Sequence, residues 1–387
     1  MSIPRQLRSE VLRAAEVFPA VVVAGPRRVG KTSLLREAFP EATWVLLEDP
    51  DVLARAKADP RGFLDQFQGP VLLDEIQNAP ELLPYVRTRI DRAPTPGRWL
   101  ITGSQEFALM RGVTESMAGR AAILRLLPFG VEEHTGVGPL WGGFPEVVLN
   151  APDRAALWFD SYVQTWLERD LRAILNVSSL SLFRRFLAVL ASRSGQLLNK
   201  TEIAAPLGVS VPTVTSWLDA LETSGVLIPT PPWFTNFGKR LLKSPRVYLC
   251  DSGLTCHLLG LADQAALDRS THLGPIFEGF VATELVKHRA FAGRRPGLHW
   301  FRDQAGLEVD FVLEGADLAP IFVEVKASST PRPEDARGIR ALRSAAPNQA
   351  PEDYVVYRGT LGATPLVPGV LAVDVPTLHT RLRGRGW

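Results

Sequence analysis

The segment Ala20-Val-Val-Val-Ala-Gly-Pro-Arg-Arg-Val-Gly-Lys-Thr32 decides the fold of the first part of the chain. Five apolar residues are followed by Gly25, four further residues, and then Gly30, Lys31 and Thr32. A short apolar run before this spacing predicts a buried strand that leads into a phosphate-binding loop. Residues 33–38 continue with a helical pattern, so the local context is strand, loop and helix, as a phosphate loop requires.

The residue types of the loop suit a nucleoside triphosphate. Glycines let backbone N–H groups wrap around phosphates, Lys31 can neutralise the β and γ oxygens, and the hydroxyl of Thr32 can bind magnesium. We therefore expect ATP and Mg²⁺ as cofactors. The expected binding residues are Gly25, Pro26, Arg27, Arg28, Val29, Gly30, Lys31, Thr32 and Ser33.

A second apolar run, residues 71–73, ends in two acidic residues, Asp74 and Glu75. We expect Asp74 to hold magnesium and Glu75 to orient the attacking water as a general base. The alternative is a strand followed by a solvated acidic turn.

A third run, residues 99–102, leads to Ser104, with Gln105 beside it. Ser104 is the candidate sensor of the γ-phosphate or of the attacking water, although an ordinary turn at a strand end has the same pattern. Together with residues 44–47, these strands alternate with helical stretches, which predicts a parallel α/β sheet.

The totals exclude several protein classes. The chain has 387 residues, of which 46% are apolar and 22% charged, so it differs from disordered and fibrous proteins and has material for two or three domains. The formal net charge of +2 is too small to require a polyanionic partner. Residues 184–246, however, contain eight basic and three acidic side chains, which gives this stretch a net charge of +5.

Cysteine usage and hydropathy indicate a cytoplasmic location. Cys250 and Cys256 are too few for a disulfide framework or a four-cysteine zinc site. Residues 1–20 mix charged and apolar residues at helical spacing, unlike a secretory signal. No window approaches the roughly 20 apolar residues that span a bilayer, so we expect a soluble protein without a membrane partner.

The central part is predicted to be helical. Residues 153–192 have apolar residues at steps of three and four, typical of a helical lid or connector, and residues 201–224 show a helix-turn-helix pattern. If this unit is a winged helix, its second helix would turn hydroxyls toward a DNA groove and nearby basic residues would contact phosphates. Hydroxyls favour recognition of backbone or shape over base reading, and a purely structural or protein-docking role is the alternative. The expected DNA-binding residues are Lys200, Thr213, Thr215, Ser216, Lys239, Arg240, Lys243 and Arg246.

Acidic residues and a lysine recur in the last part of the chain. A helix over residues 276–291 carries Glu278 and Glu284, and later strands carry Asp310 and the pair Glu324 and Lys326. This order resembles the PD-(D/E)XK nucleases. It implies that Asp310 and Glu324 bind magnesium and that Lys326 positions or activates water.

Strand alternation puts Glu324 and Lys326 on one face, and Glu284 is the preferred helix acid over Glu278. The alternative is an ordinary surface pair on a fold that does not cleave. The histidines show no ligand spacing and are expected to be structural or surface residues. They are His134, His257, His272, His288 and His299.

Five segments in order resemble AAA-type ATPases of bacteria and archaea that carry a C-terminal nuclease-like domain of undefined function. They are the loop at Gly25, Leu-Asp-Glu-Ile-Gln at Leu73, Thr-Gly-Ser at Thr102, Ala-Gly-Arg at Ala118 and Gly-Gly-Phe-Pro-Glu at Gly142. The resemblance implies that Arg120 stabilises charge in the reaction, within the chain or from a neighbouring subunit. A surface salt bridge is the alternative role. Action from a neighbour would require a dimer or a ring, such as a hexamer.

These observations predict an α/β protein with four parts. They are an AAA-type ATPase core (1–140), a helical lid (141–192), a winged helix-turn-helix (193–244) and a PD-(D/E)XK restriction-endonuclease-like domain (245–387). We expect an oligomeric, ATP-driven motor that acts on DNA, with branched DNA such as a Holliday junction as a substrate by analogy. Two rivals stay open: a DNA-binding ATPase whose last domain clamps without cutting, and a nucleotide switch that regulates a protein partner.

Overall fold

Strand β1 (Ala20–Ala24) lies inside a five-stranded sheet with the order β2-β3-β4-β1-β5. The computed structural model describes residues 3–103, 117–150, 154–166, 180–233, 244–315, 318–345, 352–360 and 362–387. The chain forms two compact units. The first comprises the residues up to Phe129 with the short segments Thr223–Gly225 and Ala290–Arg294, and the second comprises the remainder.

The first sheet is parallel throughout. Its other strands are β2 (Thr43–Leu46), β3 (Val71–Asp74), β4 (Trp99–Gly103) and β5 (Ala121–Arg125). All residues of β1 and β4 are buried, as expected of strands with both faces covered. The predicted parallel α/β sheet is therefore confirmed, and β5 is a strand that the sequence analysis did not predict.

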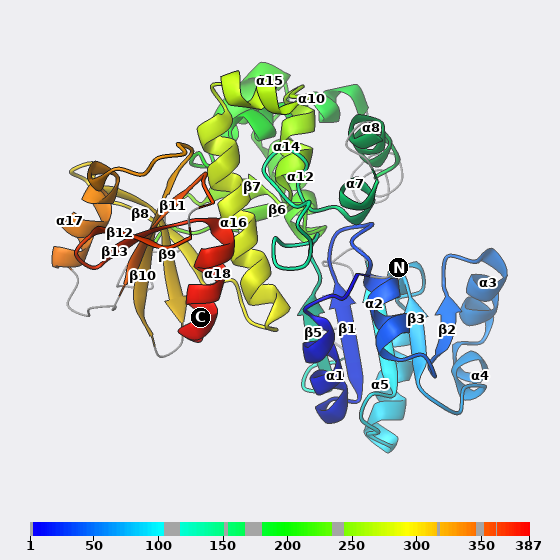
Figure 1. The fold of residues 1–387 in the computed structure, drawn as a ribbon. Coiled ribbons are helices and arrows are strands. Elements are labelled where there is room, and N and C mark those ends of the chain that lie inside the picture. The colour runs from blue at the N-terminus through cyan, green and yellow to red at the C-terminus, as the bar shows by residue number, and fades with distance from the viewer. Residues whose placement is uncertain are drawn as a thin grey trace. The chain divides into compact units, whose positions relative to one another are not determined.

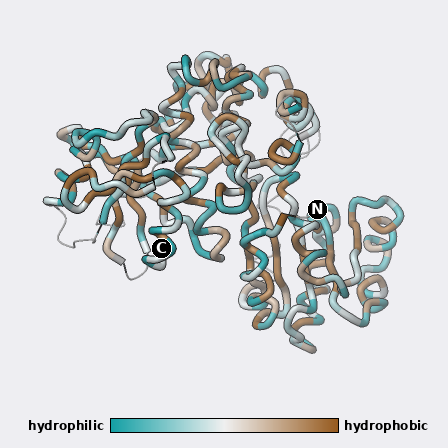
Figure 2. The backbone as a smooth tube through the Cα atoms, in the orientation of Figure 1, coloured by the Kyte–Doolittle hydropathy of each residue, from teal (hydrophilic) through white to brown (hydrophobic). Residues whose placement is uncertain are grey.

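Helices cover this sheet (Figure 1). They are α1 (Arg8–Val17), α2 (Lys31–Ala38), α3 (Pro50–Ala58), α4 (Pro60–Asp65) and α5 (Leu82–Arg92), with a 3-10 turn η1 (Ile76–Asn78). Helix α2 buries Lys31, Leu34, Leu35 and Ala38, the spacing of one helix face, against β3 and β4. Hydrophobic residues follow the strands, whereas the helices alternate between hydrophilic and hydrophobic residues (Figure 2).

Helices form the first half of the second unit. They are α7 (Pro145–Leu149), α8 (Ala155–Trp166), α10 (Leu180–Ser192), α11 (Lys200–Ala204) with the turn η4 (Ala205–Leu207), and α12 (Val211–Thr223). Trp217 of α12 packs against Phe183 and Phe186 of α10 with ring centroids 5.2 and 5.0 Å apart. An antiparallel pair, β6 (Leu227–Thr230) and β7 (Arg246–Leu249), follows.

A mixed six-stranded sheet forms the second half of this unit, with the order β12-β13-β11-β10-β9-β8. Its strands are β8 (Leu298–Arg302), β9 (Glu308–Gly315), β10 (Leu318–Lys326), β11 (Asp353–Tyr357), β12 (Thr364–Val367) and β13 (Val370–Val373). Its helices are α14 (Ser252–Leu258), α15 (Gln264–Arg269), α16 (Leu273–Phe291), α17 (Arg337–Ala345) and α18 (Val375–Gly384), with the turn η5 (Pro333–Ala336). Ile339 and Leu342 of α17 join Val309, Phe322 and Val355 in its core.

Two expected boundaries differ from the structure. The first unit ends at Phe129 rather than near residue 140. The expected boundary at 244/245 separates β6 from β7, which pair with each other, so the hairpin joins the two parts that it was expected to divide. Within the described residues, no helix combines the length and apolar character that crossing a bilayer requires.

Candidate active site

The loop after β1 is shaped by two glycines. Gly25 has φ +144°, and a Cβ atom there would lie 2.0 Å from the carbonyl oxygen of Leu126, so no other residue fits. Gly30 has φ +91° and directly precedes α2. The chain thereby turns from the sheet into a helix whose first N–H groups face the loop, which is the arrangement that binds phosphate.

Lys31 lies at the first position of α2, with its ammonium over the loop. Its Nζ donates to the carbonyl oxygens of Gly25 and Pro26, at 3.0 and 2.9 Å, and the side chain is buried. A phosphate in the loop would therefore meet a positive charge that is already positioned there.

Asp74, at the end of β3, accepts three side-chain hydrogen bonds. Its Oδ1 accepts from Thr32 at 2.7 Å and from Thr102 at 2.5 Å, and its Oδ2 accepts from the indole N–H of Trp44 at 3.2 Å. The predicted magnesium ligands Thr32 and Asp74 thus lie together. A hydroxyl and a carboxylate are the hard oxygen ligands that suit Mg²⁺, and the remaining positions around this ion are usually water and phosphate oxygens.

Thr102 and Trp44 were not predicted. A signal for Thr102 existed, because β3 and β4 are parallel neighbours and their carboxyl ends meet at one edge of the sheet. Trp44 gave no such signal, because an indole is not a recognisable part of a phosphate-loop motif.

Glu75 follows Asp74 in a left-handed backbone conformation, with φ +58°. Its N–H donates to Thr102 Oγ1 at 2.9 Å, and its carboxylate accepts a hydrogen bond from Gln77. Such backbone conformations are unfavourable for residues with a side chain and concentrate at functional sites. The predicted base Glu75 is therefore held in a fixed position directly after the predicted metal ligand Asp74. The expected sensor Ser104 and its neighbour Gln105 lie outside the described residues.

Arg5 contacts the backbone of the loop, and this role was not predicted. Its guanidinium donates to the carbonyl oxygens of Val29 and Leu127, at 2.6 and 2.7 Å, and it is buried over the ring of Phe129. Of the loop arginines, Arg27 lies 3.8 Å from Glu48, and Arg28 has a left-handed φ of +62°.

Arg120 lies at the other end of the sheet. Its carbonyl accepts from the N–H of Ala20, at the amino end of β1, whereas the loop follows the carboxyl end of β1. At about 3.3 Å per residue, this separation is roughly 15 Å. Its guanidinium pairs with Asp91, and this hydrogen bond holds the pKa of Asp91 below its usual range. This position argues against action of Arg120 on the ATP of its own chain, and the pair with Asp91 is the salt bridge given as the alternative role.

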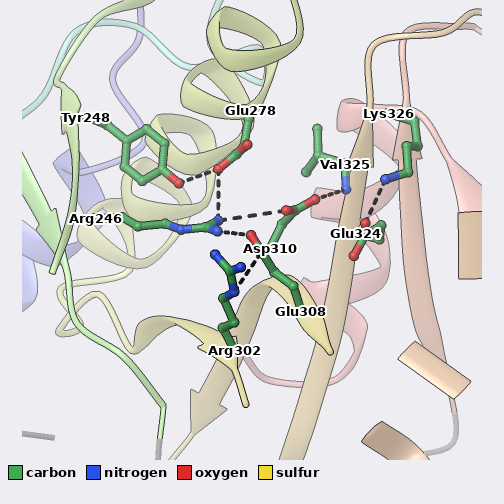
Figure 3. A network of polar contacts seen from close by, with 9 residues as sticks. All are labelled: Arg246, Tyr248, Glu278, Arg302, Glu308, Asp310, Glu324, Val325 and Lys326. Carbon is green, nitrogen blue, oxygen red and sulfur yellow. Dashed lines mark hydrogen bonds and ion pairs between the residues drawn. The ribbon is translucent and has the colours of Figure 1, made fainter. Parts of the chain in front are cut away.

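A second cluster of polar residues lies in the second unit, on strands β9 and β10 (Figure 3). Asp310 Oδ2 accepts from the N–H of Val325 at 2.8 Å, and Lys326 Nζ donates to Glu324 Oε1 at 2.7 Å. Strand pairing places Val323 opposite Phe311, so Glu324 and Asp310 come next in the register. The three predicted residues Asp310, Glu324 and Lys326 are thus brought together.

Arg246 is in this cluster, which corrects the expectation that it contacts DNA phosphates. It is buried, and its guanidinium lies 3.3 Å from Glu278, 3.8 Å from Asp310 and in contact with Glu308. Tyr248 donates to Glu278 at 2.6 Å. Alternation along β7 turns Arg246 and Tyr248 to the same side, toward these carboxylates.

Glu278, and not Glu284, is the helix acid of the cluster, which corrects the earlier preference. Glu284 is fully buried, where it accepts from Lys287 at 2.7 Å and from the N–H of Val131 at 2.9 Å. The two glutamates are six residues apart on α16, so their directions differ by about 120° around the helix axis.

Burial raises the pKa of three acids in this cluster, Glu278, Asp310 and Glu324. Burial and the nearby charge of Asp310 raise the pKa of Glu278 to about 7 and that of Glu324 to about 7. Burial also raises the pKa of Asp310. Oε2 of Glu324 is buried without a hydrogen-bond partner among the described residues. These carboxyls therefore keep their protons to a higher pH than exposed ones, and a cation bound beside them would favour their charged forms.

The predicted helix-turn-helix hydroxyls are turned back to their own helix. Thr215 and Ser216 donate to the carbonyl oxygens of Val211 and Pro212, at 3.0 and 3.2 Å, and Thr213 shares a 2.8 Å hydrogen bond with Ser210. Lys200 is half-buried at the start of α11. The other expected contacts, Lys239, Arg240 and Lys243, lie outside the described residues.

The Gly-Gly-Phe-Pro-Glu segment has a structural role within the second unit. The N–H of Gly143 donates to Asp251 Oδ2 at 2.7 Å, and a Cβ atom at Gly142 would lie 2.0 Å from Asp251 Oδ1. Asp251 also caps α14. Gly142 therefore allows the chain to approach this helix end closely.

The first site lies in a segment that matches a known family model. Residues 17–135 match the family model described as "AAA domain". Residues 139–265 and 273–371 match two models described as domains of unknown function, DUF8612 and DUF4143. Among solved structures, the Walker-type ATPase PABY2304 of Pyrococcus abyssi is 17% identical, with a TM-score of 0.44 over 65% of this chain and 94% of that one.

Two mycobacterial proteins match nearly the whole chain. They are "Uncharacterized protein Rv2008c" of Mycobacterium tuberculosis and "Uncharacterized protein Mb2031c" of Mycobacterium bovis, each 35% identical over 97% of this chain and 84% of the relative. The family match and the loop, lysine and aspartate geometry agree on the first unit. The chain therefore belongs to the family of these two mycobacterial proteins, and its first unit is a P-loop ATPase of the AAA type.

Proposed function

We propose that this P-loop ATPase couples ATP hydrolysis to the processing of DNA, and that its second unit carries a metal-dependent phosphodiester site. The supporting observation is that Asp310, Glu324 and Lys326 meet on adjacent strands (Figure 3). In this proposal, Asp310 and Glu324 hold Mg²⁺ and Lys326 positions or activates the attacking water.

The charge of the cluster fits a divalent cation. Four carboxylates and three cationic groups meet there: Glu278, Glu308, Asp310 and Glu324 with Arg246, Arg302 and Lys326. Among the described residues, Oε2 of Glu324 is buried without a hydrogen-bond partner, so it is available to a cation. Burial, followed by the charge of Asp310, raises the pKa of Glu278 to about 7, and a bound cation would lower that pKa again. When bound, Mg²⁺ would supply Lewis-acid polarisation of a phosphoryl oxygen.

The position of Arg246 supports a second candidate, a DNA clamp that does not cut. Its guanidinium already lies between Glu278, Glu308 and Asp310 and offsets part of their charge. If Arg246 takes the place of the metal permanently, the fold keeps its shape but loses its chemistry.

Helices α11 and α12 with the β6–β7 pair support the proposal of a winged helix-turn-helix. Because Thr215 and Ser216 are engaged by their own helix, base reading would require breaking those hydrogen bonds. Recognition of DNA shape or backbone is therefore the favoured mode, with branched DNA as the first substrate to test. In this proposal Arg120 acts on the ATP of a neighbouring subunit, because it lies at the other end of its own sheet from the loop, and such action requires an oligomer.

The test uses the whole protein with plasmid and branched oligonucleotides, in Mg²⁺ or Mn²⁺. We expect metal-dependent cleavage by the wild type, loss of cleavage in Asp310→Ala, and unchanged cleavage in Asp303→Asn, an aspartate in the loop before β9 whose side chain accepts from the N–H of Leu307. DNA binding without cleavage by the wild type would favour the clamp. If no form of DNA changes the rate of ATP turnover and no gel shift appears at low salt, the remaining candidate is a nucleotide switch that regulates a protein partner.

A further inference from the structure

Two buried histidines and one glutamate meet in the second unit, away from the Asp310 cluster. His288 of α16 and His379 of α18 have ring centroids 4.9 Å apart. Oε2 of Glu132 lies 3.6 Å from Nδ1 of His288 and 3.4 Å from Nδ1 of His379. His288 was expected to be an isolated structural or surface residue, because its two neighbours here are remote in sequence.

His379 is the least satisfied member of this group. Its side chain is 1% exposed, and neither ring nitrogen has a hydrogen-bond partner within the part of the chain that the structure describes. Buried polar groups in folded proteins almost always have such a partner. A neutral imidazole, moreover, must offer one acceptor nitrogen. The geometry therefore leaves a lone pair of His379 available beside a carboxylate.

The distances fit a shared ion better than direct hydrogen bonds. N–H···O hydrogen bonds have donor–acceptor distances of about 2.7–3.2 Å, whereas both nitrogen–oxygen distances here are longer. Two ligands at about 2.0 Å from a tetrahedral zinc ion lie roughly 3.3 Å apart. All three ligand atoms lie within 4.8 Å of one another, so small side-chain rotations would close the set around one ion.

The ligand types also suit a metal. A carboxylate oxygen and imidazole nitrogens are all ligands that bind zinc. Arg383 contacts the other carboxylate oxygen, Oε1, and its own side chain is 60% exposed, so it does not block Oε2.

We propose that Glu132, His288 and His379 form a site for a zinc-like divalent transition-metal ion, bound through one carboxylate oxygen and two imidazole nitrogens. Three protein ligands leave a fourth position for water or another ligand. The ion would connect the segment at residue 132 with helices α16 and α18, which are distant in sequence. Its binding therefore stabilises the second unit.

The test uses the full chain after removal of metals with a chelator. The Asp310→Asn background removes a competing ligand of the other cluster. ZnCl₂ is titrated by calorimetry, and thermal unfolding is followed with and without the ion. We expect one zinc per chain and a rise in Tm with zinc. Affinity should fall at least tenfold in His379→Ala and in Glu132→Gln.

His299→Asn is the matched control. His299 also lies beside a glutamate, Glu314, at 3.2 Å, but that pair contains only one histidine. It should keep both the stoichiometry and the zinc-dependent rise in Tm. If His379→Ala does not fold, His288→Asn and Glu132→Gln take its place. Equal zinc affinity and an equal rise in Tm in the folded variants and the wild type would overturn the proposal, as would the absence of any zinc-dependent change in the wild type.

Discussion

Thr102 joins the two acidic residues of the ATP site through one hydroxyl. It donates to Asp74 Oδ1 at 2.5 Å and accepts from the N–H of Glu75 at 2.9 Å. Thr102→Val keeps the shape of the side chain but removes both interactions. We expect kcat for ATP hydrolysis to fall by about 10- to 100-fold, the usual effect of losing a residue that orients a metal ligand. Steady-state ATPase kinetics measure this effect.

Thr88→Val is the control for that change. Thr88 lies on α5, where its exposed hydroxyl donates to the carbonyl of Pro84 at 2.9 Å, so kcat should stay unchanged. Lys31→Ala is the reference variant for complete loss of ATP turnover. An unchanged kcat in Thr102→Val would mean that Asp74 and Glu75 are positioned without this hydroxyl.

The titration of Glu324 makes a second prediction at this scale. Its folded-state pKa is about 7, against 4.5 ordinarily. A raised pKa stabilises the folded protein fully below the ordinary value, and this contribution is lost as pH rises through about 7. Glu324→Gln is uncharged at every pH and removes this loss. We therefore expect the Tm of the variant minus that of the wild type to rise between pH 5 and pH 8.

The corresponding change in the free energy of unfolding is at most about 3 kcal/mol, since one pKa unit is about 1.4 kcal/mol. Thermal unfolding in metal-free buffers at each pH measures it. Glu202→Gln is the control, because Glu202 forms an exposed ion pair with Arg193. Its Tm difference from the wild type should stay constant between pH 5 and pH 8. Adding Mg²⁺ or Mn²⁺ at pH 8 should raise the Tm of the wild type only. A pH-independent difference for Glu324→Gln would show that Glu324 titrates as an ordinary surface acid.

Among the elements, those with a strong local signal were predictable. β1 and α2 lie on either side of the phosphate loop, and both were expected from apolar runs and spacing. β5 was missed because Ala121 and Ala122 have little strand preference and one of its residues, Ile123, is exposed. β6 and β12 each contain a proline, which argues against a strand when the pairing partner is unknown.

Helix α16 shows why the second site was only partly predictable. Apolar residues are buried on all sides of it, and Glu284 and Lys287 are buried as well. Without an exposed face, hydrophobic spacing does not reveal which way a glutamate points. Arg246 could not be placed either, because a basic residue in a basic stretch has the same sequence pattern whether it contacts DNA or neutralises buried acids. The pairing of β7 with β6, and the contact of Arg246 with Glu308 of β9, decide between these two roles.

At the scale of the whole molecule, the position of Arg120 bears on assembly. It lies at the amino end of the first sheet, whereas the ATP loop lies at the carboxyl end. If Arg120 stabilises the reaction, as we propose, it must therefore act from a second copy of the chain. We expect Arg120→Ala to lower kcat by about 10³-fold, the lower end of the range for such arginines.

Subunit mixing separates this role from the ion pair with Asp91. Lys31→Ala has a defective loop but an intact Arg120, and Arg120→Ala has the reverse. If Arg120 acts on a neighbour, an equimolar mixture regains ATP turnover that neither variant has alone, and the regained activity depends on protein concentration. Asp91→Asn breaks the same ion pair and should keep turnover. If the mixture stays inactive while Asp91→Asn loses turnover as Arg120→Ala does, Arg120 has only a structural role.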